Sequence, residues 1–252
     1  MKWPKPQFHK IIFELRYAQG HRYLDRCGET FIEIENRAPG WIPQEVSPSR
    51  GALIHLDKEI LFGFNSYKLD AAQDHPKDTK EFREQIALLT DIVCKNLGIS
   101  TFVRIGLRLF FLYPAASMEE AEEMVCQSKV ATPNPKLLQI FGSVPQAQKH
   151  IFIFQNGQVG RRIEIGALRR EEGRLVPELL SVEPRNLPKG QREALTKKLL
   201  ETKRYSEDPR FSLQVDIDNY ENDPEAFSVP SFIEKHEEFA QNELLKFLRR
   251  GQ

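Results

Sequence analysis

The sequence has little of what identifies most secreted or nucleic-acid-binding proteins. Its 252 residues include only three cysteines, and 36 basic residues balance 36 acidic ones, so the formal net charge is zero. An odd number of widely separated cysteines argues against a disulfide framework and indicates a reducing compartment. A neutral chain lacks the overall positive charge of a dedicated nucleic-acid-binding protein, so we do not expect nucleic acid as its partner.

Long apolar runs are also absent. No stretch approaches the roughly 18 uncharged residues of a membrane-spanning helix, and the first residues lack the apolar core of a secretion signal. We therefore expect a cytoplasmic protein of bacterial type that has no membrane partner. A chain of this length, with 40% hydrophobic residues, is predicted to form a single α+β domain over residues 1–252.

Motifs that carry catalysis or hold cofactors are missing too. The chain has no Gly-x-Ser-x-Gly, Walker or Gly-x-Gly-x-x-Gly element. Its six histidines are scattered, without the spacing of two histidines on one helical face. The sequence therefore predicts no standard zinc site, no cofactor and no enzymatic activity.

The most informative segment that is present is the run of residues 102–111, which reads as one long strand. Successive side chains of a strand point to opposite faces of its sheet, so this run has one apolar and one charged face. Arg104 and Arg108 flank Gly106 on the charged face and must find partners there. The apolar face is expected to hold Val103, Ile105, Leu107, Leu109 and Phe111.

The remaining periodicities indicate a mixture of hairpins and a few helices. Strands are expected at residues 11–17, 52–56, 60–69, 150–155, 159–168, 175–182 and 211–218. Helices are expected at residues 24–34, 78–98, 118–127 and 231–248, where apolar residues recur every three or four positions. Adjacent hairpins with few helices favour the α+β class, with a largely antiparallel sheet and helices packed on one face.

Charged residues on the polar faces of three strands are the first candidate binding site. If these strands are neighbours, their side chains form one charged strip, which can hold an anion or a divalent metal ion. The alternative is a set of cross-strand ion pairs that stabilise the sheet, an arrangement that is commoner in proteins. The residues concerned are Glu14, Arg16, Arg104, Arg108, Asp216 and Asp218.

A basic segment at residues 185–204 is the second candidate. Its cations could contact a phosphate backbone, but aromatic residues for base stacking are lacking there except Tyr205, so a solvated helix surface is the simpler interpretation. The candidate contacts are Arg192, Lys197, Lys198, Lys203 and Arg204.

Three short motifs carry a resemblance to a known group of proteins. They are Phe13-Glu14-Leu15-Arg16, Arg104-x-Gly106-Leu107-Arg108, and Leu213-x-x-Asp216-Ile217-Asp218 ahead of a histidine-containing last helix. Together they resemble a sporadically distributed family of uncharacterised bacterial proteins of about this length, and the chain also looks like an accessory protein of a type III-E CRISPR system. The resemblance implies no activity, but the patchy distribution is similar to that of defence-associated genes.

These observations favour a non-enzymatic accessory or adaptor protein that binds another protein, encoded in the same operon, within an antiviral defence system. Two alternatives stay open. One is a metal- or phosphate-dependent enzyme that uses the charged strip, and the other is a nucleic-acid-binding accessory that uses residues 185–204.

Overall fold

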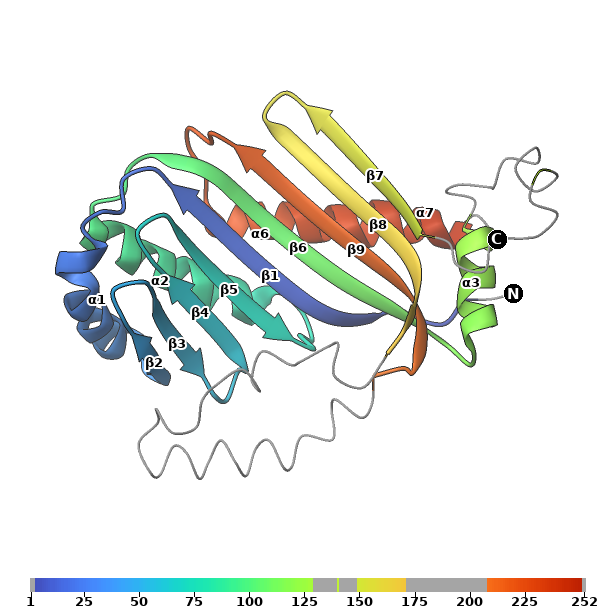
Figure 1. Cartoon of the computed structure of the whole chain (residues 1–252), viewed down its shortest axis with the longest axis horizontal. Helices are drawn as coiled ribbons and strands as arrows, with labels where there is room; N and C mark the ends of the chain where they lie inside the picture. Colours follow the sequence, from blue (N-terminus) through green and yellow to red (C-terminus); the bar gives the residue numbers. More distant parts are fainter. Residues whose placement is uncertain (1–2, 129–139, 141–148, 171–207, 251–252) are drawn as a thin grey trace.

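Nine antiparallel strands form one open sheet in the computed structural model, which describes residues 3–128, 140, 149–170 and 208–250 (Figure 1). Their order across the sheet is β2-β3-β4-β5-β1-β6-β9-β8-β7. The expected strand at residues 175–182 lies outside the described residues. The strands are β1 (Gln7–Tyr17), β2 (Trp41–Val46), β3 (Gly51–His55), β4 (Ile60–Phe64), β5 (Lys68–Asp74), β6 (Phe102–Ala115), β7 (Lys149–Asn156), β8 (Val159–Arg169) and β9 (Phe211–Asn222).

The described helices pack on one face of this sheet (Figure 1). The charged side chains of β1, β6 and β9 alternate with the buried apolar ones and therefore lie on the other face. Helix α1 packs beside α2 and against β2, whereas α3 covers β8 and β9. The predicted α+β class with helices on one face is thus confirmed. The helices are α1 (Tyr23–Arg37), α2 (Lys80–Leu97), α3 (Met118–Gln127), and a C-terminal helix made of α6 (Val229–Glu238), η4 (Phe239–Leu244) and α7 (Leu245–Arg250).

The core lies between the helices and the inner face of the central strands. Ile105, Leu107 and Leu109 of β6 are fully buried there, as the alternation predicts. The prediction that Val103 belongs to the apolar face is wrong, because its side chain is 41% exposed. The backbone carbonyl of Val103 accepts a hydrogen bond from Asp223 beyond β9, so this residue lies where the sheet ends.

Helix α3 starts as its sequence predicts. The Ser117 hydroxyl accepts a hydrogen bond from the Glu120 backbone N–H at 3.2 Å, and the Glu120 carboxylate accepts one from the Ala116 N–H at 2.6 Å. These two bonds close a reciprocal cap that satisfies backbone N–H groups at the start of the helix.

The C-terminal helix differs from its prediction at two points. It begins at Val229, because Ser228 rather than Ser231 supplies the capping hydroxyl and Pro230 suits the first turn. Its middle, Phe239–Leu244, winds as a π-helix rather than as a continuous α-helix. No described helix is both long and apolar enough to cross a membrane.

We predict that Leu107→Asp prevents folding, because it places an unpaired charge among fully buried apolar side chains. Val103→Asp is the matched control on the same strand, where the side chain reaches solvent. Circular dichroism and thermal melting should show loss of the cooperative transition for the first variant and a near-native transition for the second. A folded Leu107→Asp protein would contradict the assignment of the strand's two faces.

We also predict an acid-sensitive contribution from His236, which lies buried in the C-terminal helix against Phe232. Burial, with Lys235 and Arg161 nearby, lowers the pKa of His236 from 6.5 to about 4. The unfolded chain therefore binds more protons than the folded chain between these values, so stability falls as the pH drops from about 6.5 to about 4.

The loss should be on the order of 3 kcal/mol, and His236→Gln should flatten the pH dependence in this window. Urea unfolding of both proteins at several pH values measures the effect. If the free energy of unfolding changes equally with pH in the two proteins, His236 does not contribute to the pH dependence.

Candidate functional site

The six charged residues singled out in the sequence lie on neighbouring strands, because β1, β6 and β9 are consecutive in the sheet. Their side chains share the face that the described helices leave uncovered. The pairing register places Arg108 directly opposite Asp218 and places Arg104 opposite Asn222. The charged strip is therefore a real feature of the fold, and its chemistry depends on how the charges are paired.

Arg108 binds Asp216 rather than the residue directly opposite it. Its Nε and Nη2 donate to the two carboxylate oxygens at 2.8 and 2.6 Å, a bidentate pair. Asp216 is 1% exposed, and the Nη1 of Arg162 lies 3.7 Å from it. The hydrogen bond to Asp216 raises the pKa of Arg108, as expected for a cation held by a buried carboxylate.

Arg104 contacts Asp218 and an aromatic ring. Its Nη2 lies 3.5 Å from the carboxylate, and its guanidinium lies 4.2 Å from the ring centroid of Tyr220. Burial raises the pKa of Asp218 despite the three nearby arginines, Arg104, Arg108 and Arg162. A Cβ at Gly160 would lie 2.1 Å from the Tyr220 ring, so a larger residue there would displace this ring.

The part of the strip near the C-terminal end of β1 is more exposed. The Glu14 carboxylate accepts from Arg16 at 2.7 Å and from Lys68 of β5 at 3.2 Å. Burial opposes ionisation of Glu14, but these two cations lower its pKa overall. Every carboxylate of the strip thus has a cationic partner, an arrangement typical of cross-strand stabilisation. The basic residues proposed at 185–204 lie outside the described residues.

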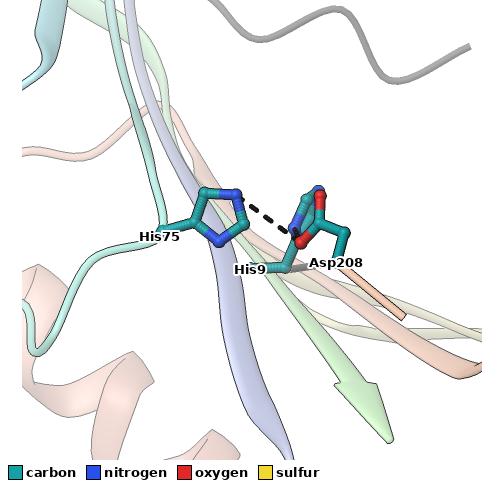
Figure 2. Close-up of side chains that lie close together, drawn as sticks. All are labelled: His9, His75 and Asp208. Carbon is teal, nitrogen blue, oxygen red and sulfur yellow. Dashed lines mark ion pairs between the residues drawn. The ribbon is translucent and has the colours of Figure 1, made fainter. Parts of the chain in front are cut away.

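A second cluster, which sequence reasoning missed, lies at the opposite end of β1. His9, His75 and Asp208 point toward one another from three separate segments (Figure 2). The Oδ1 of Asp208 lies 3.3 Å from the Nδ1 of His9 and 3.6 Å from the Nε2 of His75. One nitrogen from each ring and one carboxylate oxygen lie within 4.8 Å of one another. Among the described residues, this is the group with the ligand types and spacing to hold a metal ion.

Two irregularities of the backbone place the histidines. The register between β1 and β6 shifts between Phe8 and Lys10, so His9 occupies a β-bulge, which re-aims a side chain. His75 follows β5 with φ +49°, a left-handed conformation that costs a non-glycine residue about 1 kcal/mol or more. The His75 backbone N–H donates to the His9 carbonyl at 2.7 Å, which fixes the two residues relative to each other.

Asp208 precedes β9, and its backbone carbonyl accepts a hydrogen bond from Arg170 at 3.1 Å. His9 and Asp208 are 6% and 8% exposed, so water is largely excluded from the cluster. Burial lowers the pKa of His75, although the Asp208 carboxylate opposes this shift. The neutral imidazole that results near pH 7 is the form that binds metals.

The cluster adjoins a cavity of about 400 Å³, because His75 also lines its wall. Six carboxylates and three lysines line the same cavity, so it carries a net negative potential that favours cations. The carboxylates belong to Asp57, Glu59, Asp74, Asp78, Glu81 and Glu84, and the amines to Lys58, Lys77 and Lys80.

A third feature is the exposed edge of the sheet at β7. This strand carries apolar side chains on both faces, and Ile153 and Phe154 are 69% and 54% exposed. Among the described residues, no strand pairs with its outer side. An edge of this kind presents unpaired backbone N–H and C=O groups next to apolar surface.

Comparisons with known proteins give no assignment: no protein-family model matches the chain, and no curated protein matches it. Three features of the described residues therefore bear on function: the charged strip, the histidine cluster and the β7 edge.

We predict that Arg108→Met lowers the free energy of unfolding by about 2–3 kcal/mol, because it leaves the buried Asp216 carboxylate without its bidentate partner. Arg16→Met is the matched control on the same face, with a more exposed ion pair that should contribute less than about 1 kcal/mol. Chemical denaturation at neutral pH compares the two. Similar losses in both variants would show that burial of Asp216 does not govern the pair.

Proposed function

We propose that this protein is a non-enzymatic accessory protein that binds an extended segment of another protein along the outer edge of β7, with which no described strand pairs. The observation that carries this proposal is the difference between the two edges of the sheet. At one edge, β2 is short, contains Pro43, and shifts register against β3 between Pro43 and Glu45. Proline and bulges of this kind protect an edge strand from pairing with other chains.

The β7 edge has none of these protections. Its eight residues pair with β8 one to one from Lys149 to Asn156 without a register shift, and they include no proline. The exposed apolar side chains are Ile151, Ile153 and Phe154, at 48%, 69% and 54%. A regular, apolar and unprotected edge strand is the surface to which an added strand binds in β-augmentation.

The composition of β7 indicates the chemistry of its occupant. Backbone pairing gives affinity to any extended segment, whereas the side chains select those with apolar residues at alternate positions. Lys149 is the one formally charged side chain on β7, and it already contacts Glu164 of β8. A partner segment with alternating apolar residues and an acidic residue near Lys149 fits this surface best.

The biological setting is part of the same proposal. Cys27 and Cys94 are free thiols, which supports a cytoplasmic location. The family resemblance of the three sequence motifs supports a partner encoded in the same operon of a bacterial, CRISPR-associated antiviral defence system. The experiment therefore identifies the partner first and then tests the β7 edge directly.

The test is co-purification of the tagged protein from its native host, identification of stoichiometric partners by mass spectrometry, and reconstitution of the complex from purified components. We predict that Ile153→Lys weakens this complex at least about tenfold, because a charged side chain blocks pairing at the edge. Val46→Lys is the matched control, since Val46 is 61% exposed on the opposite edge strand. Hydrogen exchange should show protection of residues 149–156 in the complex.

Three outcomes would overturn the proposal. The first is a complex that Ile153→Lys leaves intact, and the second is equal weakening by Val46→Lys. The third is a homodimer of the purified chain, seen by light scattering, that Ile153→Lys separates into monomers. That third result would make a second copy the occupant of β7.

A further inference from the structure

We propose that His9, His75 and Asp208 form a binding site for a divalent transition-metal ion of the zinc or iron(II) class. This site is separate from the β7 edge and independent of the function proposed there.

The spacing suits one shared ion. Two ligand atoms bound about 2.0–2.2 Å from a tetrahedral metal ion lie roughly 3.4 Å from each other. The Asp208 oxygen lies 3.3 Å from the His9 nitrogen and 3.6 Å from the His75 nitrogen, close to this value (Figure 2). Both contacts are longer than the about 2.8 Å of a charge-assisted hydrogen bond. The side chains therefore converge on a common point at metal-ligand spacing.

The ligand types select the class of metal. Imidazole nitrogen suits zinc, iron, nickel and copper, whereas magnesium and calcium prefer sites made of oxygen ligands alone. Two histidines and one carboxylate leave coordination positions open for water or a small ligand. We therefore assign a first-row divalent metal ion with three protein ligands from this chain.

The backbone holds the ligands before any ion arrives. His9 is the bulged residue of β1, and His75 adopts a left-handed conformation after β5. The 2.7 Å hydrogen bond between the His75 N–H and the His9 carbonyl joins the two irregularities. A pre-arranged ligand set of this kind binds its ion without a large rearrangement of the chain.

The cavity beside His75 provides a route for the ion. Its carboxylates outnumber its lysines by six to three, so the local potential draws cations toward the cluster. The acidic cavity alone would not define a site, but His75 in its wall also belongs to the cluster with the buried His9 and Asp208.

The test is titration of the full chain, free of any polyhistidine tag and stripped of metal with a chelator, with Zn²⁺ by calorimetry and with Co²⁺ by visible absorption. We expect one equivalent of each ion per chain. Asp208→Asn and His9→Gln should weaken binding at least about tenfold, since loss of even an outer partner of a metal ligand costs about 10–100-fold. His236→Gln is the control, because it removes a buried histidine remote from the cluster in sequence.

A second measurement on the unaltered protein keeps the proposal testable if the variants fold poorly. Long-range ¹H–¹⁵N spectra of the histidine rings should show that Zn²⁺ shifts the Nδ1 resonance of His9 and the Nε2 resonance of His75, and leaves the rings of the other histidines unchanged. Absence of stoichiometric binding, unaltered binding in both cluster variants, an equal loss in His236→Gln, or Zn²⁺-induced shifts confined to other histidines would each overturn the proposal.

Discussion

The alternation of side chains along the three central strands is the constraint on which the rest of the structure depends. β1, β6 and β9 are long neighbouring strands of the sheet, and the register that is continuous over Lys10–Arg16 of β1 fixes which side chains lie on each face. The register that buries Leu107 on the helix side also brings Arg108 to Asp216 on the other side. A slip of one residue would exchange the two faces and place both arginines of β6 in the apolar core.

Where local pattern and long-range packing agree, the fold could be predicted from the sequence. Helix α2 ends close to its predicted end, with Gly98 as a left-handed C-cap, and strand β6 begins at Phe102 as predicted. The other two ends differ, because α2 begins at Lys80 rather than at residue 78 and β6 continues to Ala115 rather than ending at residue 111. The prediction of the C-terminal helix is wrong at its start and in its middle. Both Ser228 and Ser231 have capping chemistry, and which of them acts depends on how the chain enters the helix. The π-helical segment has no comparable signal in a single sequence, since one extra residue in a turn barely changes the apolar periodicity.

The two candidate sites differ in the same way. The charged strip was visible in the sequence because each of its residues stands on the polar face of an alternating strand. The pairing of these charges could not be predicted, because Arg108 binds Asp216, which lies diagonally across from it, and not Asp218, which lies directly opposite. The histidine cluster was invisible, since its members come from positions 9, 75 and 208 and depend on a bulge and a left-handed residue. Neither backbone feature follows from local composition.

The irregular backbone at His9 and His75 indicates what the histidine cluster does. A regular β1 strand and an ordinary turn after β5 would avoid the cost of a bulge at His9 and of a positive φ at His75. Departures from local preference persist where the surrounding structure enforces them, and they concentrate at functional sites. Here one hydrogen bond links the bulge at His9 to the left-handed His75, and both imidazoles point at the carboxylate of Asp208. A structural ion pair would need only one histidine for Asp208, so the second imidazole is explained better by a ligand that all three residues share.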